Sequence, residues 1–434
     1  MKKIIALLLA CMMVIGLFAA CGGSKAPAAD APAADAPAAD APAADAPATP
    51  EEVNLKVWAP GDEMEITRQM VESFKAVHPE YNLTVEILDL GIDQCDKVLM
   101  NDPDAGADVF QLPSGGIPAM IEAGLLLPIT VDVDAVKSLY GEGALASCIA
   151  YNEALGMDLL YSIPFSPNTW FVYYNTDMFT AEEVKSLDVM MAKDLGEGIQ
   201  NFSCDITNSW YIEAFFYAAG CNLYGEYGNN PDECDWNSAN GVKAVEYMAN
   251  LVANPKYLEE ADSISFNMLK EGKLGAVCSG TWSYPDLYAA MGDKLGACAL
   301  PTIEIDGQTC QMQNFADYKT WAVKSNTKHP VAAQQLAAWL ANEESQLLRY
   351  TEAGAAPTVL SLLDAPEVAA NVSVVAIIDQ TNYSVPQPSI PKINDYWTPA
   401  SALGEGIVNG AITGANAQAE LDKLVNNITG DILG

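Results

Sequence analysis

The sequence predicts an α/β protein with two lobes, in each of which helices cover a mainly parallel sheet. Strand-like and helix-like segments alternate from residue 53 to the end of the chain, the order that produces parallel sheets. Residues 51–434 are also long enough to fill two lobes with substantial cores. Because the alternation never stops, we expect each lobe to contain more than one chain segment.

The first strand–helix–strand unit shows the pattern most clearly. Residues 53–58 alternate apolar and polar side chains as a strand does, and Gly61-Asp62 follows as a turn. A helix is expected next, because apolar side chains recur at helical spacing until His78-Pro79 ends the run, and residues 83–88 form a second strand. The apolar face of this helix comprises Ile66, Met70, Val71, Phe74 and Val77.

Later segments repeat this unit. Further strands are predicted at residues 108–112, 170–175, 274–278 and 320–323. Helical spacing predicts helices at residues 117–123, 242–252, 331–349 and 417–425. In such proteins ligands bind at the ends of strands, so we expect a site there, facing the other lobe.

The N-terminus reads as an export signal. Lys2 and Lys3 precede an apolar stretch at 4–18 that is too short for an ordinary membrane-spanning helix. Two alanines then lead to Cys21, which we expect to become the lipidated first residue, so residues 1–20 would be a signal peptide. Phe18 stands where this lipidation motif usually has leucine, and the alternative is an uncleaved anchor.

Residues 21–50 are expected to be a spacer after the lipid anchor. Residues 26–45 are four copies of Ala-Pro-Ala-Ala-Asp, and 46–50 begin a fifth that decays. Regular proline and negative charge with little apolar bulk favour an extended chain over a core. Residues 51–434 then form the solute-binding domain.

The charge balance narrows the possible partners. The chain carries 57 acidic against 21 basic residues, a net charge of −36. Nucleic acid and phosphate-rich ligands would be repelled, which leaves neutral or cationic ligands. No apolar run after residue 50 is long enough to span a membrane.

The cysteines give no sign of a metal site. There is no CxxC motif, the only histidines are His78 and His329, and we expect no metal and no cofactor. Export permits disulfides, but an even number of thiols does not establish one. The thiols of the expected binding domain are Cys95, Cys148, Cys204, Cys221, Cys234, Cys278, Cys298 and Cys310.

An ordered series of motifs over residues 53–432 resembles extracellular solute-binding proteins of the maltose- and maltodextrin-binding type. The pieces in the first half are Leu55-Lys56-Val57-Trp58, Ala107-Asp108-Val109-Phe110, Glu122 to Ile129, Ile163-Pro164 and Val172-Tyr173-Tyr174-Asn175. Those in the second half are Phe266 to Gly272, Ser279-Gly280-Thr281-Trp282, Leu300-Pro301, Asn314 to Lys319, Ala338-Trp339-Leu340, Ala353 to Thr358 and Ile390 to Pro399.

The resemblance implies a periplasmic-binding-protein-like fold of type II, whose two lobes close over a ligand by hinge motion. It implies chain crossings near 164–168, 305–316 and 370–377. The first lobe would then hold residues 53–164 and about 316–370, and the second about 168–305 and 377–434. The spacing of residues alone would not have located these hinges.

The resemblance also implies a function. The chain would be the substrate-binding component of an ABC sugar importer, lipid-anchored at the extracellular face of the cytoplasmic membrane of a Gram-positive-type bacterium. It would bind an oligosaccharide, with maltodextrin favoured, deliver it to permease subunits, act as a monomer and carry out no catalysis.

Sugars present an apolar face of C–H groups and an edge of hydroxyls, so a sugar site combines flat rings with hydrogen-bonding groups. By resemblance, the stacking rings are Trp210, Trp282 and Trp397. The polar ligand contacts implied in the same way are Asp62, Gln111, Asn168, Asn208, Asp317 and Tyr318. Asn168 and Asn208 stand where the family has glutamates, Gln111 where it has a tryptophan and Glu63 where it has a lysine, so the sugar or its register can differ.

Two other functions compete with this interpretation. A binder of another solute, such as a polyamine, fits the acidic composition and would need carboxylates around ammonium groups. A glycoside hydrolase would need two opposed carboxyl groups, whereas the matched cleft positions are Asn168 and Asn208, which cannot act as general acids. No Gly-x-x-x-x-Gly-Lys-Ser/Thr nucleotide loop occurs, so ATP use belongs to other chains.

Overall fold

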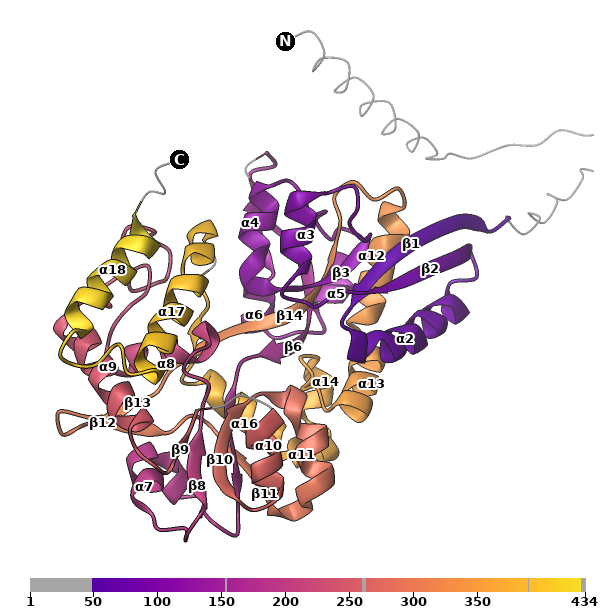
Figure 1. Cartoon of the computed structure of the whole chain (residues 1–434). Coiled ribbons are helices and arrows are strands. Elements are labelled where there is room, and N and C mark those ends of the chain that lie inside the picture. The colour runs from indigo at the N-terminus through magenta and orange to yellow at the C-terminus, as the bar shows by residue number, and fades with distance from the viewer. Residues whose placement is uncertain (1–48, 153, 260–262, 389, 431–434) are drawn as a thin grey trace, which may run out of the picture. The chain divides into compact units, whose positions relative to one another are not determined.

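The computed structural model describes residues 49–152, 154–259, 263–388 and 390–430 (Figure 1). The expected signal peptide, Cys21 and nearly all of the spacer lie outside these residues. The described chain folds around two sheets, one of six strands and one of five, with helices packed on both. Among the described residues no helix combines the length and the apolar character needed to cross a membrane.

The first sheet confirms the predicted strand–helix–strand unit. Its strands are β1 (Glu51–Ala59), β2 (Tyr81–Asp89), β3 (Val109–Pro113), β6 (Ser162–Asn168), β14 (Phe315–Val323) and β15 (Val385–Pro386). β1 runs parallel to β2 and β3, whereas β14 runs antiparallel to β3 and β6. The sheet is therefore mixed, with three of its five strand pairings parallel and the two antiparallel ones both made by β14.

Helices cover both faces of the first sheet. They are α2 (Met64–Val77), α3 (Cys95–Asn101), α4 (Ile117–Glu122), α5 (Val133–Lys137), α6 (Glu142–Ala146), α12 (Pro330–Leu340), α13 (Glu343–Ala353) and α14 (Leu360–Leu363). The helix predicted at 331–349 is thus two helices, because the Asn342 side chain accepts a hydrogen bond from the Ser345 amide at 2.9 Å and starts α13. Val77, expected on the apolar face of α2, is exposed.

The second sheet is also mixed. Its strands are β7 (Phe171–Asn175), β8 (Gln200–Ser203), β9 (Tyr257–Leu258), β10 (Leu274–Ser279) and β11 (Leu295–Cys298), in the order β11-β7-β10-β8-β9. β8 and β10 are parallel, and β7, which follows the first crossing, is antiparallel to both of its neighbours. Two short hairpins, β4 (Ile149–Asn152) with β5 (Met157–Leu160) and β12 (Thr302–Ile305) with β13 (Gln308–Gln311), lie outside the sheets.

The second lobe carries the other α-helices of the described residues. They are α7 (Leu187–Ala192), α8 (Ser209–Ala218), α9 (Ala239–Val252), α10 (Ser263–Lys270), α11 (Tyr284–Met291), α15 (Pro366–Ala369), α16 (Val372–Thr381), α17 (Trp397–Val408) and α18 (Ala417–Thr429). The helices predicted at 242–252 and 417–425 correspond to α9 and α18. In Figure 1 α17 and α18 lie side by side on the outside of this lobe, beside α8 and α9.

The chain passes between the lobes where buried side chains change from one core to the other. Phe165 packs in the first core and Trp170 in the second, so one change of core lies between these two residues, and the predicted bounds of the lobes stay predictions. Phe315 belongs to the second core and Trp321 to the first, so β14 itself makes the second passage. The third passage falls between Leu362 and Val368, a few residues before the predicted 370–377.

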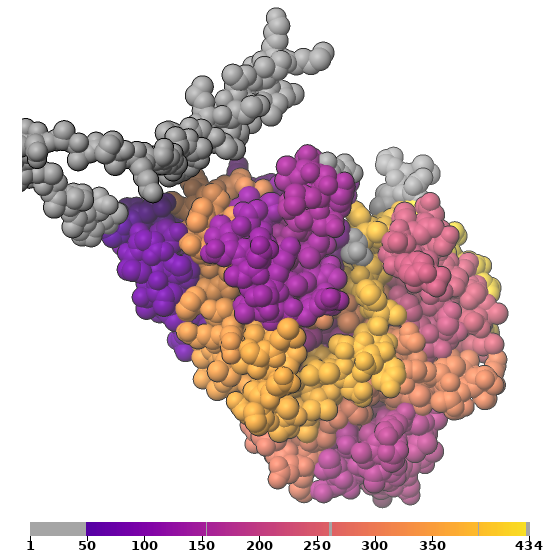
Figure 2. Space-filling view, turned by 180° about the vertical axis from the view of Figure 1, so that it is seen from behind, coloured from indigo at the N-terminus to yellow at the C-terminus, as the bar shows by residue number. Residues whose placement is uncertain are grey.

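The segment after α13 therefore connects the lobes on the outside of the molecule. Figure 2, seen from behind, shows its golden surface below the purple surface of the residues that precede β6. Val385 at the end of this segment pairs with Phe315, so β15 joins β14 at the crossing. The division into two moving bodies remains a prediction.

Candidate ligand site at the crossing strands

One face of β14 brings most of the predicted site residues together. Phe315, Asp317 and Lys319 are two residues apart along this strand, ahead of the register shift that follows Lys319, so their side chains project to one face. Phe315 contacts Trp210 and Trp397, and Lys319 lies over Trp282. The three predicted tryptophans thus meet side chains of the same strand.

Trp210, Phe315 and Trp397 form an aromatic group, with each pair of ring centroids 6.2 Å apart. The Asn208 side chain caps α8 by accepting from the Trp210 amide at 2.9 Å, so Asn208 fixes the ring by fixing the first turn. Trp397 starts α17. Both tryptophans are half-buried, so each keeps part of its ring available to a ligand.

Asp317 occupies the middle of this face. Asn168 Nδ2 donates to its Oδ1 at 2.5 Å, and within the described residues its Oδ2 has no hydrogen-bond partner. Burial raises the pKa of Asp317 to about 7, against the lowering effects of Asn168, a backbone amide and Lys319. A buried carboxylate oxygen without a donor is well suited to accept a ligand hydroxyl.

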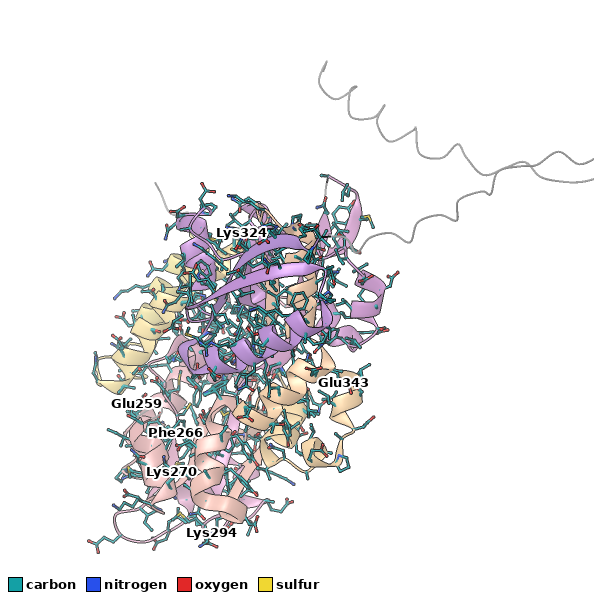
Figure 3. The ribbon with its side chains drawn as sticks, turned by 90° about the vertical axis from the view of Figure 1, so that its right-hand side faces the viewer. Glu259, Phe266, Lys270, Lys294, Lys324 and Glu343 are labelled. Carbon is teal, nitrogen blue, oxygen red and sulfur yellow. The ribbon has the colours of Figure 1, made fainter. Side chains whose placement is uncertain are left out.

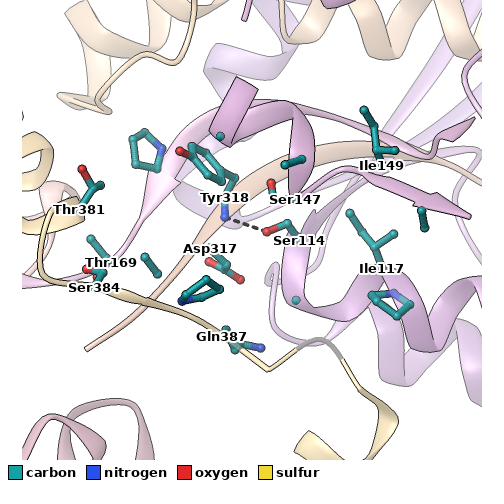
Figure 4. Close-up of a pocket in the computed structure, with 18 residues that line it drawn as sticks. Ser114, Ile117, Ser147, Ile149, Thr169, Asp317, Tyr318, Thr381, Ser384 and Gln387 are labelled. Atoms are coloured by element: carbon teal, nitrogen blue, oxygen red, sulfur yellow. Dashed lines mark hydrogen bonds between the residues drawn. The ribbon is translucent and has the colours of Figure 1, made fainter. Parts of the chain in front are cut away.

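A cavity of about 410 Å³ opens beside Asp317 (Figure 4). Its polar lining includes Ser114, Ser384 and Gln387, and the Tyr318 amide donates to Ser114 Oγ at 3.0 Å. Of the predicted ligand residues, Asp317 and Tyr318 line this cavity, whereas the tryptophans and Asp62 do not.

Trp282 faces the middle of β14, where Lys319 lies. It lies on the turn η4 (Thr281–Ser283), its side chain is 41% exposed, and Lys319 Nζ is 5.7 Å from its ring centroid. A Cβ added to Gly280 would lie 2.0 Å from Cζ3 of Trp282. The ring therefore folds back over the Gly280 backbone, which only a glycine permits.

A buried ion pair supports the turn that carries Asp62. Glu63 ends the turn η1 (Gly61–Glu63), accepts from Arg349 Nη1, and accepts from Gln111 Nε2 at 2.7 Å. Burial alone would raise the pKa of Glu63, but the charges of Arg349 and Lys319 and both hydrogen bonds lower it to about 2. Asp62 is exposed beside this pair.

Gln111, predicted to contact the ligand, lies with its side chain buried against Glu63. Its side chain is 1% exposed and holds Glu63, so the structure places it in the support of the turn. A direct ligand contact of Gln111 remains a prediction, as do the ligand contacts of the other predicted residues.

Three residues of this site were absent from the sequence prediction: Phe315, Lys319 and Arg349. Lys319 had a usable signal, since it and Asp317 are the charged residues at 315–323, a region that ends in a predicted strand. Arg349 stacks over Phe165 and Trp321 at 4.5 and 5.4 Å from the ring centroids, contacts between distant segments that no local pattern reveals.

Within the described chain no three His, Cys, Asp or Glu side chains are arranged to hold a metal ion. The eight cysteines of this part are free thiols.

Two lobes, chain crossings at their junction, and aromatic rings beside a buried carboxylate define a solute-binding protein of the maltose-binding-protein fold. The family model of bacterial extracellular solute-binding proteins matches residues 69–376. The chain belongs to that family, which consists of binding proteins and not of enzymes.

Individual relatives match over nearly the whole described chain. The galactooligosaccharide-binding protein of Bacillus subtilis (strain 168) is 26% identical, over 87% of this chain and 89% of its own. A solved structure of maltodextrin binding protein MalE1 from L. casei BL23 is 28% identical with a TM-score of 0.75, over 87% of this chain and 99% of its own. A further chain, solved with acarbose, is 29% identical with a TM-score of 0.80, over the same shares.

Proposed function

We propose that this chain captures an oligosaccharide, with maltodextrin favoured, as the substrate-binding component of an ABC importer. The main observation in support is the face of β14, where Asp317 lies between the aromatic group and Trp282. Flat rings suit the apolar faces of sugar units, and the carboxylate suits their hydroxyls. The sugars named for the relatives support the same class of ligand.

The ligand would bind with closure of the lobes. Trp282 and the aromatic group come from the second lobe, whereas Asp62 comes from the first, so a ligand that touches both favours the closed arrangement. Scattering radii measured with and without saturating maltotriose test this step. We expect a smaller radius with ligand, and equal radii would contradict closure.

Cys21 would carry a lipid and anchor the protein to the outer face of the cytoplasmic membrane. The repeat at 26–45 would hold the binding domain away from that surface, at about 3 Å per residue if extended. The bound sugar would then pass to permease subunits on other chains, and the protein would act as a monomer.

A polyamine is the second candidate, because the chain is strongly acidic. A polyamine site needs several carboxylates that are free to cage ammonium groups. Around β14 the carboxylate of Glu63 already pairs with Arg349, and Lys319 adds a further positive charge. This balance favours a neutral ligand over a cation.

Calorimetry of residues 51–434 with maltotriose, a galacto-oligosaccharide and spermidine tests the proposal. We expect binding of at least one oligosaccharide, no binding of spermidine and no hydrolysis of the bound sugar. Binding of spermidine alone would replace the sugar proposal with the polyamine function.

A further inference from the structure

Lys319 is a cation in the middle of the site that has no carboxylate partner. Its side chain is half-buried, and among the described residues no acidic oxygen lies within 4.0 Å of its Nζ, whereas nine of the sixteen described lysines form such a pair. It still acts on Glu63 and Asp317 at longer range, since its charge lowers the pKa of both. Its closest aromatic contact is the ring of Trp282.

That contact joins the two lobes. Lys319 lies on β14, which is paired with β3 and β6 of the first sheet, whereas Trp282 follows β10 of the second sheet. Glu63 already has two partners of its own, because Arg349 and Gln111 both donate to its Oε2. The ammonium therefore lies over an exposed ring that would otherwise face water.

We propose that Lys319 determines the specificity of this site. In the empty protein its ammonium lies over Trp282, and it moves aside when a sugar unit stacks on the ring, then donates hydrogen bonds to hydroxyls of that unit. An ammonium offers three donors and no acceptor, so it matches neutral polyols. It also repels cationic ligands, which the net charge of −36 would otherwise attract.

The inference rests on the proposed sugar function and can fail separately from it. The informative variants are Lys319→Met, which keeps the length of the side chain without its charge, and Lys319→Arg, which keeps the charge. The matched control is Lys294→Met, which makes the same charge change at an exposed lysine that pairs with Asp177. Figure 3 shows Lys294 at the opposite end of the molecule from Lys324, which lies on the first-lobe side of the view.

Calorimetry with maltotriose and with spermidine is the main measurement. We expect Lys319→Met to weaken maltotriose binding about tenfold or more, the scale of a lost hydrogen bond to a charged group. Lys319→Arg should retain part of the affinity, and Lys294→Met should match the parent protein. Spermidine should bind Lys319→Met more tightly than the parent, because the repelling charge is gone.

Tryptophan emission of the empty protein tests the contact itself. Lys319→Met should change the emission of the parent protein but not that of a Trp282→Phe variant, and thermal unfolding confirms that each variant is folded. Equal maltotriose affinity of Lys319→Met and the parent would overturn the specificity role while leaving the sugar function intact. A parent protein that binds no oligosaccharide would overturn both.

Discussion

Asn168 Nδ2 donates to Asp317 Oδ1 at 2.5 Å and so ties β6 to β14 where both strands pass between the lobes. Both residues lie at a point where any hinge motion has to act. The remaining oxygen of Asp317 has no partner among the described residues, and the carboxyl is almost completely buried. The protonation state of Asp317 therefore affects the stability of the crossing. It also affects how well the carboxyl of Asp317 can accept a hydrogen bond from a ligand hydroxyl.

The first prediction concerns Asp317→Asn and pH. Burial raises the pKa of Asp317 to about 7 from 3.8, so the folded protein favours the protonated carboxyl. The stability that this group contributes is complete below pH 3.8 and is lost as pH rises towards 7, at up to about 1.4 kcal/mol per pH unit. Asp317→Asn should remove that component, so urea unfolding of parent and variant should diverge between these pH values.

Asp62→Asn is the matched control, since it makes the same chemical change at an exposed position of the site. Unlike Asp317→Asn, this variant keeps the buried carboxyl whose titration the first prediction concerns. Parallel profiles of Asp317→Asn and the parent would show that Asp317 does not titrate in this window.

The second prediction concerns the buried pair of Glu63 and Arg349. Arg349→Met removes one partner and leaves a buried carboxylate unpaired, which costs about 3–5 kcal/mol of unfolding free energy. The stability that Glu63 contributes is present above its unfolded pKa of 4.5 and is lost as pH falls towards 2, so the variant should lose this acid sensitivity.

The double variant Glu63→Gln/Arg349→Met separates the pair from simple loss of packing. It leaves no buried charge at this position, so it should be more stable than Arg349→Met alone. If the double variant is destabilised by the sum of both single changes, the two side chains are not coupled.

Features of the fold could be predicted where the pattern of residues within one segment determines them, and not where they depend on contacts between distant segments. The strand at 53–58 and the helix after it follow from alternation and helical spacing, and the structure has them as β1 and α2. The direction of a strand in its sheet was harder to predict. The strands β7 and β14 are antiparallel to strands that are far away in sequence, and such pairing leaves no local pattern. The break between α12 and α13 depends on one capping asparagine inside an otherwise helical pattern.

Resemblance suggested most of the candidate site residues, and their contacts with a ligand stay predictions, whereas contacts that depend on burial could not be predicted from the sequence. Trp210, Trp282 and Trp397 do meet side chains of one strand. Gln111 was expected at the ligand, yet its amide is buried against Glu63. That contact spans 48 residues and becomes visible only once β3 lies beside β1.

The third prediction tests the placement of Trp282. In Gly280→Ala the new methyl group would overlap the indole, so the ring has to leave its present position. We expect the free energy of oligosaccharide binding to weaken by about 1 to 2 kcal/mol, the scale of a displaced aromatic contact. The free energy of unfolding should change by less than that. Gly141→Ala is the control, because its added Cβ meets only Leu360 at 3.7 Å, and it should leave affinity unchanged.

The fourth prediction concerns Cys21, which lies outside the described residues. Cys21→Ala should release the protein from membranes without altering ligand affinity, because the repeat at 26–45 separates the anchor from the binding domain. Cell fractionation measures the first effect and calorimetry the second. Retention of the variant in the membrane fraction would rule out anchoring through Cys21.

The last prediction concerns Trp397, which packs against Phe315, Tyr396 and Trp210 yet remains half-buried. Trp397→Ala should weaken oligosaccharide binding by roughly 1 to 3 kcal/mol, the scale of losing a large aromatic contact. Some loss of stability is expected as well, because the inner part of the ring packs against the aromatic group.

Two comparisons separate binding by Trp397 from packing. Trp397→Phe keeps a ring on Phe315 and should recover much of the stability but only part of the affinity. Tyr396→Phe removes the hydroxyl that donates to the Ser209 carbonyl at 2.8 Å in the core, so it should lower the melting temperature and leave affinity unchanged. Calorimetry and thermal unfolding on all three variants decide the matter, since reduced stability with unchanged affinity in Trp397→Ala would assign this indole to the core.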